Sequence, residues 1–460
     1  MTGIPLIIAF VIAVALMIVA ISKFKVHPFL AIMAISLLLA LVAGIPLVKS
    51  GDTAGIPDVI GAGFSGTFSS IGIVIILGAF IGAVLEQTGA ALKLADMVVK
   101  LVGKKNPELA MELMGWVVSI PVFCDSGFVI LDPIRKALTR RTRTSSVAMT
   151  VSLSAGLYIS HVFIPPTPGP IAAANTLGIG DNLLLVIGLG VLCSIFPLIA
   201  GLFYAKFIGK RVKSADETTA EDAQAVVKTY EELVAEYGKL PNGLNALAPI
   251  IVPVILMALG TIGAQLGVTG FALSLLSFLG TPIIALAAGT LFAILQLGLA
   301  KKMKDFYKIT NDTLKTVGPI LFVTAAGGVL GKVISSTSMV SYIKDNAAFL
   351  QNLGIFFPFL LAAILKTAQG SSTVAITTTA GIMAPLMSTL GLASPVLAAL
   401  TVMAIGAGAM TVSHANDSYF WVVTNFGEMK PEQGYKTQTL LTLVMGIASI
   451  IGIFIVSLFF

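Results

Sequence analysis

The chain has 460 residues, of which 57% are hydrophobic and only 11% are charged. A typical soluble protein carries about 25% charged residues, so this composition excludes both a soluble globular protein and a disordered one. The net charge of +6 comes from basic residues in short loops between apolar runs. That distribution indicates orientation in a lipid bilayer rather than binding to nucleic acid.

Long stretches without Asp, Glu, Lys or Arg follow one another along the chain. Residues 1–22 form the first, and they lack a basic leader and a cleavage motif, so we expect a retained first span. About 20 apolar residues cross a bilayer as a helix. The stretches 240–300 and 367–416 are therefore too long for one helix each.

The basic clusters predict the topology, because positively charged loops stay in the cytoplasm. These clusters lie at 23–25, 93–105, 135–143, 206–213 and 301–315. The expected N- and C-termini then face outside. Segment 111–133 has basic loops on both sides, which predicts a re-entrant hairpin from the cytoplasm. Segment 354–391 has nearly uncharged loops on both sides, which predicts a second hairpin from outside.

The hydrophilic segment 207–245 divides the chain into halves, 1–206 and 246–460, and we expect it to be a cytoplasmic linker. DSGFVI at 125–130 is similar to SSTVAI at 371–376, and a Ser-His pair occurs at 160–161 and again at 413–414. Two halves of opposite orientation are typical of inverted-repeat secondary transporters. The predicted fold is an all-α polytopic membrane protein with about 10 transmembrane helices and two re-entrant hairpins.

The first polar constellation is FCDSGFVIL at 123–131. Asp125 lies in the middle of the first hairpin, and an ionisable residue at membrane depth indicates a functional site. Its carboxylate can carry a proton or hold a cation. Ser126 and Gly127 allow the backbone to turn and present amides to a ligand. Alternatively, Asp125 only caps the second arm of the hairpin.

The second constellation is SHVFIPPTPGPIAAA at 160–174. Its prolines remove amide donors and predict that the helix unwinds there. His161 lies at the break and can exchange a proton near neutral pH. A neutral histidine bonded to a freed carbonyl is an equal alternative. Thr167 is a candidate hydroxyl ligand.

The third constellation is AQGSSTVAITTTAG at 368–381, at the tip of the second hairpin. Gly370, Ser371, Ser372 and Thr373 supply hydroxyls and free amides, which suit an anionic or polyhydroxylated ligand. Lys366 precedes this tip by one turn. It either reaches an interface along its aliphatic stem or pairs with a carboxylate of the substrate or of the protein.

The fourth constellation is SHANDSYFW at 413–421, where Asn416, Asp417 and Ser418 interrupt an apolar helix. Asp417 is a second candidate proton site. Alternatively, the chain has reached the cytoplasmic surface there and Asp417 is solvated.

Together these motifs resemble the gluconate permease (GntP-type) family of bacterial proton symporters over essentially the whole chain. The resemblance includes KFKVHPFLA at 23–31, FCDSGFVIL, SHVFIPPTPGP, AQGSSTVA and DSYFW. It implies uptake of a small hydroxylated carboxylate across the bacterial inner membrane. It also implies a site at the positions that match the family motifs: Asp125, Gly127, His161, Pro165, Pro166, Gly370, Ser371, Thr373, Asp417 and Ser418.

Two positions depart from the family pattern. Many members have Glu-Val where this chain has Asp125-Ser126, and many have His where this chain has Thr167. Both departures fall at the expected site and concern the choice of substrate.

The resulting hypothesis is a transporter for gluconate or a related acid such as glycerate or D-serine. Asp125, His161 and Asp417 would couple transport to protons, and sodium coupling is the alternative. No metal, cofactor or catalytic residue is expected, because Walker A, HExxH and Cys/His clusters are absent from the sequence. A channel with a re-entrant filter is a second hypothesis. An intramembrane hydrolase using Ser371, His161 and Asp125 is a third. A homo-oligomer is compatible with this pattern, since lipid-facing and partner-facing apolar surfaces look alike.

Overall fold

The computed structural model describes residues 3–102, 106–120, 122–218, 240–265, 269–338, 342, 353–414 and 417–460. These residues are helical almost throughout, and an isolated bridge between Ser50 and Thr53 is their one extended pairing. Seven helices in the described part are long and apolar enough to cross a membrane, or eight if a bent pair at the end of α3 is counted. The prediction of an all-α polytopic protein is confirmed.

The helices before the linker begin and end where local sequence permits. Proline occupies the first or second position of α2, α3, α5 and α8, where its missing amide hydrogen costs no helical bond. In chain order these helices are α1 (Ile4–Ser22), α2 (Pro28–Ala43), α3 (Ile56–Gln87), α4 (Ala90–Val102), α5 (Pro107–Val118), α6 (Cys124–Thr142), α7 (Ser146–Phe163), α8 (Pro168–Thr176), the 3-10 turn η1 (Gly180–Asn182), α9 (Leu183–Ile208) and the short α10 (Ala215–Thr218).

The second half follows the same local rules, with proline at the start of α14 and α20. Its elements are α12 (Gly243–Gln265), α13 (Gly270–Gly280), α14 (Pro282–Leu299), η2 (Met303–Asp305), α15 (Phe306–Ser335), α18 (Phe356–Gln369), α19 (Ser372–Met383), η3 (Ala384–Leu386), α20 (Pro395–Met410), α21 (Ser418–Phe426), α22 (Pro431–Gly434), the π-helical turn η4 (Tyr435–Thr439) and α23 (Leu440–Ser457).

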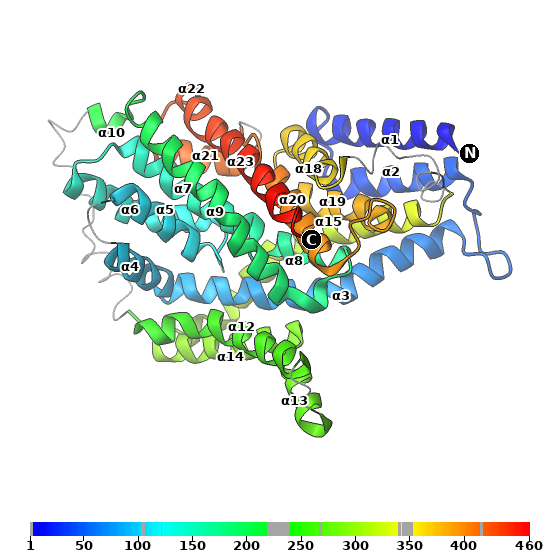
Figure 1. Cartoon of the computed structure of the whole chain (residues 1–460), viewed down its shortest axis with the longest axis horizontal. Helices are drawn as coiled ribbons and strands as arrows, with labels where there is room; N and C mark the ends of the chain where they lie inside the picture. The colour runs from blue at the N-terminus through cyan, green and yellow to red at the C-terminus, as the bar shows by residue number, and fades with distance from the viewer. Residues whose placement is uncertain are drawn as a thin grey trace.

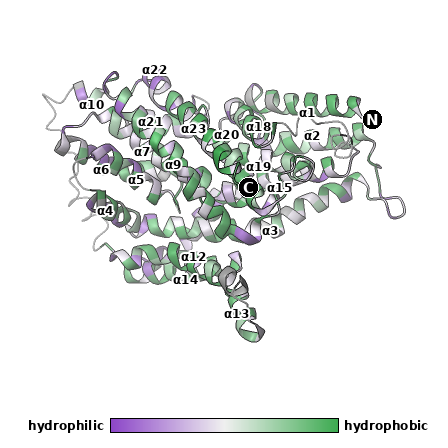
Figure 2. Ribbon diagram, in the orientation of Figure 1, coloured by the Kyte–Doolittle hydropathy of each residue, from purple (hydrophilic) through white to green (hydrophobic). Residues whose placement is uncertain are grey.

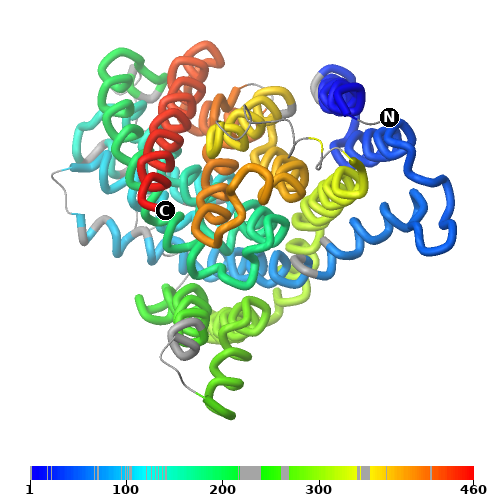
Figure 3. The backbone as a smooth tube through the Cα atoms, turned by 45° about the vertical axis from the view of Figure 1, so that its right-hand side comes forward, coloured from blue at the N-terminus to red at the C-terminus, as the bar shows by residue number. Residues whose placement is uncertain are grey.

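Two long helices form the frame of the molecule. α3 has 32 residues and α15 has 30, and they pack side by side. α2 and α14 pack against this pair, and α12 packs against α14 (Figure 1). α13 packs on α12 where Gly280 meets Gly260, projects at the edge of the molecule, and has no buried residue (Figure 1). Figure 3 shows the backbone from a second direction. We call α2, α3, α12, α14 and α15 the scaffold.

A second group of helices packs in sequence beside the scaffold. α5 contacts α7, α7 contacts α9, α9 contacts α23, α23 contacts α20, and α20 contacts α18. We call this group the core bundle. α7 is at its centre, because all 18 of its residues are buried. α8 and α19 join the bundle to the scaffold by packing on α3 and α15 respectively.

Each half of the chain contributes a helical hairpin followed by a broken helix to this region. α5 and α6 form the first hairpin, and α18 and α19 form the second. α7 and α8 are separated by an interruption at 164–167, and α20 and α21 by one at 411–417. The hairpins extend over 107–142 and 356–386, so the first is longer at both ends than the predicted 111–133.

The polar ends of the helices gather on one side of the molecule. Figure 2 shows hydrophilic residues at α10, at α22 and at the ends of α4 and α6, far from the N-terminus. These elements adjoin the basic clusters that we predicted to be cytoplasmic. The orientation across the membrane, the inverted repeat and the boundary between the halves stay predictions. Most of the predicted linker, 219–239, lies outside the described residues.

Candidate functional site

A buried ion pair lies where the second hairpin meets the interruption between α20 and α21. Lys366 Nζ lies 2.6 Å from Asp417 Oδ2, and the two side chains are 0% and 6% exposed. The same ammonium group donates a hydrogen bond to the carbonyl oxygen of Gly370 at the hairpin tip. The interpretation of Lys366 as an interfacial residue is therefore wrong. Its stem points into the protein, where a carboxylate is within reach.

Asp417 is held by several donors besides Lys366. Its Oδ1 accepts a hydrogen bond from the backbone N–H of Tyr419 at 3.1 Å, which caps the N-terminus of α21. Its Oδ2 accepts hydrogen bonds from Ser413 Oγ at 2.5 Å and from the Tyr158 hydroxyl at 3.5 Å. The alternative of a solvated Asp417 is wrong, because helices of both halves enclose it.

Asp125 of the first hairpin faces the start of α21. Its Oδ1 accepts a hydrogen bond from Ser418 Oγ at 3.3 Å, and Cys124 Sγ lies 3.7 Å from its Oδ2. The N-cap of α6 is Phe123 and not Asp125, so the capping interpretation is wrong. Asp125 lies in the first helical turn, where a carboxylate is stabilised by the helix dipole.

Of the two residues after Asp125, Gly127 has a described environment, and it packs against α7. Ser126 lies in α6, and its side chain is not described. A Cβ at Gly127 would lie 2.6 Å from Leu157 Cδ2 of α7. The first hairpin therefore packs closely against α7 at Gly127, and a larger residue there would displace the end of the Leu157 side chain.

The ring of His161 contacts the tip of the first hairpin and a tyrosine of its own helix. Its ring centroid lies 6.4 Å from that of Tyr158 and 6.0 Å from that of Phe123 at the first hairpin tip. The side chain is buried, and Nδ1 has no hydrogen-bond partner in the structure. A hydrolase relay would require a carboxylate at this nitrogen. The geometry does not supply that contact, and Asp125 is bonded to Ser418 instead.

The proline-rich interruption after α7 contains a cis peptide bond between Pro165 and Pro166. Thr167 is buried at the N-cap of α8, and its hydroxyl donates to the carbonyl oxygen of Ile164 at 2.6 Å. That hydroxyl satisfies the backbone of its own interruption. The structure does not bring Thr167 into contact with the ion pair.

The tip of the second hairpin presents a helix N-terminus to the ion pair. Gly370 has a φ of 92°, which permits the sharp turn between α18 and α19. Ser371 is the N-cap of α19 and accepts a hydrogen bond from the Val374 N–H at 3.3 Å. Ser372 starts α19, and its side chain lies beside Tyr158 of α7. Tyr158 is therefore close to the second hairpin tip and is hydrogen-bonded to Asp417.

The remaining candidates lie at the periphery of this cluster. Thr373 is half-buried in the first turn of α19, and Ser418 is exposed at the first position of α21. Asn416 lies outside the described residues. Val412, in the same interruption, has a φ of 58°, an unusual conformation for a β-branched residue and one that concentrates at functional segments.

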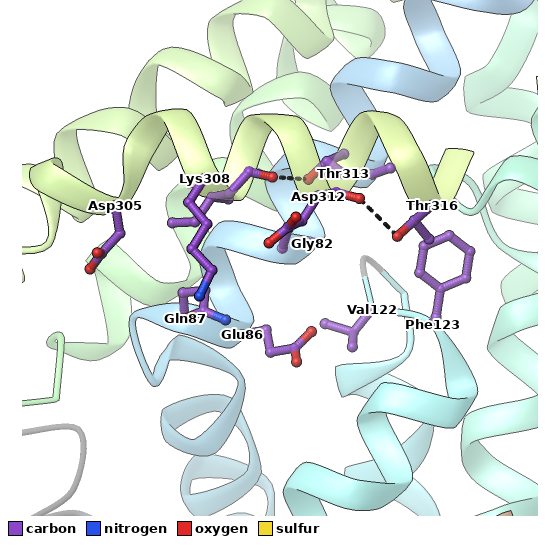
Figure 4. Close-up of a pocket in the computed structure, with 13 residues that line it drawn as sticks. Gly82, Glu86, Gln87, Val122, Phe123, Asp305, Lys308, Asp312, Thr313 and Thr316 are labelled. Atoms are coloured by element: carbon purple, nitrogen blue, oxygen red, sulfur yellow. Dashed lines mark hydrogen bonds between the residues drawn. The ribbon is translucent and has the colours of Figure 1, made fainter. Parts of the chain in front are cut away.

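A cavity of about 400 Å³ lies between the scaffold and the tip of the first hairpin. It is lined by the end of α3, the start of α15 and the first hairpin tip. Figure 4 shows Lys308 extending from α15 toward Gln87 and Glu86, with Phe123 at another part of the lining. Phe123 is shared with the site, because its ring also contacts His161. The cavity therefore borders the polar cluster.

Two residues of the cluster, Tyr158 and Ser413, were not among our candidates. Tyr158 lies three residues before His161, about one helical turn away, so the two share a face of α7. Helical spacing from His161 was therefore an available signal for Tyr158. Ser413 belongs to the repeated Ser-His pair, which marked its position but not its contact with Asp417.

Together these residues form a buried polar site at the meeting point of three helix N-termini. α6, α19 and α21 each begin here, and helix N-termini favour negative charge. One buried cation, two carboxylates and several hydroxyls surround the point of convergence. Such a site can bind a carboxylate and exchange protons.

The comparison with known proteins agrees with this chemistry. A family profile described as GntP family permease matches residues 4–459. The inner membrane permease YgbN of Escherichia coli is 32% identical over 94% of this chain and 94% of its own. The low-affinity gluconate transporter of Escherichia coli is 30% identical over 98% of both chains. A crystal structure of the YdaH transporter of Alcanivorax borkumensis, described as having an unusual topology, superimposes with a TM-score of 0.61 at 17% identity, over 94% of this chain and 97% of that one.

Proposed function

Because this chain belongs to the GntP family of permeases, we propose that it is a secondary active transporter that imports gluconate or a related hydroxylated carboxylate. Its many apolar helices make it a multi-pass membrane protein. The relative named as an inner membrane permease supports location in the bacterial inner membrane. Gluconate is the first substrate to test, since the transporter at 30% identity is named for it.

One observation supports the substrate class most directly, namely the fully buried ammonium group of Lys366 at a hairpin tip. A buried lysine is costly and is retained where it meets a negative charge. The α19 N-terminus and the hydroxyls of Ser371 and Ser372 lie beside it, as do Ser413 and Ser418 across the cluster. A hydroxylated acid offers one carboxylate for the cation and several hydroxyls for these groups.

Proton coupling is the second part of the proposal. Asp125, His161 and Asp417 are the candidate carriers, and contacts through Tyr158 and Ser418 place them in one cluster. Sodium coupling is the competing variant, because hydroxyl and carbonyl oxygens together with a carboxylate also bind a cation. The carbonyl of Gly370 and the side chains of Ser413 and Asp417 include such oxygens.

The proposed transport cycle moves the hairpins relative to the scaffold. The succession of hairpin, broken helix and long helix occurs once in each half, which supports an inverted repeat. In such transporters a substrate site at unwound helices is exposed alternately to the two sides of the membrane. The cavity beside Phe123 is on the side that we predict to be cytoplasmic.

The test is uptake by the purified protein in liposomes with labelled D-gluconate and D-glycerate. An imposed pH gradient, acidic outside, should drive accumulation without sodium. Accumulation only with a sodium gradient would replace protons by sodium as the coupling ion. Fast downhill flux without accumulation under either gradient would favour a channel. No uptake of either acid by folded protein would contradict the proposed substrate class.

A further inference from the structure

The charges of the site restrict how an anion can enter it. Lys366 and Asp417 neutralise each other while they are both buried. A monovalent carboxylate that joined this pair would leave an unbalanced negative charge in a desolvated place, which is strongly unfavourable. Entry of the substrate therefore requires that one negative charge leave the pair or be neutralised.

Building on the carboxylate transport proposed above, we propose that the substrate carboxylate and Asp417 compete for the ammonium group of Lys366. A proton from the aqueous phase binds to Asp417 Oδ2, the neutral acid releases Lys366, and the substrate carboxylate takes the vacated place. The site then contains one cation and one anion before and after binding. One proton enters with each monovalent substrate.

The two carboxylate oxygens of Asp417 have different hydrogen-bond partners, and this difference permits the exchange. Oδ1 accepts a hydrogen bond from the backbone N–H of Tyr419 and so caps the N-terminus of α21. Oδ2 faces Lys366, Ser413 and Tyr158. A proton on Oδ2 leaves Oδ1 able to accept as a carbonyl oxygen, so the cap of α21 persists. The hydroxyl groups of Ser413 and Tyr158 can rotate, so that their oxygens accept a hydrogen bond from the O–H of protonated Asp417.

The acceptor for the substrate is built from groups that stay in place during the exchange. Lys366 is also hydrogen-bonded to the carbonyl of Gly370, so its ammonium group stays at the tip when Asp417 is neutral. The N-terminus of α19 begins two residues after Gly370. Buried His161 provides an unpartnered Nδ1 within electrostatic range of both members of the pair. This nitrogen is an available partner for a polar substrate group.

Other titratable groups also face Asp417 and must be considered in any pH profile. In the described part of the chain they are Lys366 of α18, Tyr158 and His161 of α7, Cys124 and Asp125 of α6 and Tyr419 of α21. Asp125 is the nearest competitor for a second proton, since its partner Ser418 is the residue after Asp417. The test must therefore separate these two aspartates.

The experiment measures the affinity of detergent-purified protein for D-gluconate as a function of pH. If one bound proton accompanies the substrate, the dissociation constant rises about tenfold per pH unit above the protonation range. Asp417→Asn keeps the hydrogen bond that caps α21 but carries no charge. In this variant the tenfold change of the dissociation constant per pH unit that is due to Asp417 should be lost. Asp125→Asn should leave the contribution of Asp417 intact. Asp132→Asn, which neutralises a buried aspartate paired with Arg135 outside the site, is the matched control and should retain the wild-type slope.

Two further measurements keep the test decisive if Asp417→Asn does not fold. The wild-type protein should take up about one proton per gluconate bound in weakly buffered solution, and uptake of none would overturn the proposal. The double variant Lys366→Met/Asp417→Asn removes both buried charges together, so it should fold, and it should not bind gluconate at any pH. Binding by this double variant with wild-type affinity would also overturn the proposal.

The outcomes separate this inference from the proposed function. If wild-type protein binds neither gluconate nor glycerate, the proposed substrate class is wrong, and the proposed competition for Lys366 is wrong as well. If wild-type protein binds gluconate and Asp417→Asn retains the full pH slope, only the competition is wrong. A slope lost in Asp125→Asn and retained in Asp417→Asn would assign the proton to Asp125.

Discussion

Lys366 and Asp417 are the residues whose contacts define the site. The lysine lies in the last turn of α18 and the aspartate caps α21, so the pair joins a hairpin tip to an interrupted helix. Each is buried, and each is the other's partner of opposite charge. Such a pair is sensitive to the loss of one partner, because the remaining charge is then buried and uncompensated.

We therefore predict that Lys366→Met lowers the free energy of unfolding by about 3–5 kcal/mol, the usual consequence of leaving a buried charge unpaired. Lys366→Met/Asp417→Asn should recover most of this loss, since neither charge remains. Thermal unfolding in detergent, followed by circular dichroism, measures both. Equal destabilisation in the single and double variants would show that the pair does not contribute through its charges.

Asp125 is the other carboxylate at the convergence of the helices, and we predict that Asp125→Asn lowers accumulation while exchange continues. The amide can still contact Ser418 but cannot carry a proton, so substrate binding continues while the proton that Asp125 would carry is lost. Counterflow of labelled gluconate in liposomes should persist, and accumulation driven by a pH gradient should fall to the level that the single proton on Asp417 supports. Asp181→Asn, an exposed position at η1, is the control and should accumulate normally. Undiminished accumulation by Asp125→Asn would reject its coupling role.

At the level of elements, the position of the first hairpin depends on how closely α5 approaches α7. A Cβ at Gly156 of α7 would overlap the backbone carbonyl oxygen of Glu112 and lie 2.7 Å from the backbone nitrogen of Trp116. Backbone atoms cannot rotate away as side chains can. The contact therefore requires glycine, and it fixes the hairpin that carries Asp125 next to the helix that carries His161.

We predict that Gly156→Ala costs about 1–3 kcal/mol or more, because the overlap can be relieved only by moving a helix. Gly188→Ala is the matched control, since a Cβ at this exposed position of α9 meets no atom within 4 Å. This control should be neutral or slightly stabilising. The apparent melting temperatures of the two variants decide the matter. A Gly156→Ala protein as stable as wild type would refute the close packing of α5 on α7.

At the scale of the whole molecule, the distribution of basic residues predicts the orientation in the membrane. Lys304 belongs to a basic cluster at the start of α15, and Asp52 lies in the loop between α2 and α3, on the predicted outer side. Both positions are exposed, so a cysteine at either can be labelled. The two native cysteines, Cys124 and Cys193, are buried.

We predict that a membrane-impermeant maleimide labels Asp52→Cys in spheroplasts and labels Lys304→Cys only after the cells are lysed. The positive-inside rule is the physical basis, because loops rich in lysine and arginine are not translocated. Wild-type protein should stay unlabelled in intact and in lysed cells. The reverse pattern of labelling would invert the topology and place the cavity beside Phe123 on the outer side.

The amino-acid sequence by itself determined the features that depend on neighbouring residues. Apolar length predicted membrane-spanning helices. Clustered proline predicted the interruption after α7, and the Asn-Asp-Ser run predicted that after α20. Charge-free loops predicted the second hairpin. These signals are local, because backbone donors, steric restriction and the cost of burying charge act over one or two helical turns. They marked the segments that contain Asp125, Lys366 and Asp417, but not Tyr158 of α7.

The tertiary structure alone decided which of these polar groups meet. Lys366 and Asp417 are 51 residues apart, and Ser418 and Asp125 are 293 apart. A single sequence contains no signal for such pairings, so Lys366 had interfacial and buried interpretations of nearly equal merit. Packing of the core bundle removed the interfacial one, by enclosing the ammonium group beside Asp417 and the carbonyl of Gly370. The same packing brought Tyr158 to the pair and directed the hydroxyl of Thr167 to its own backbone.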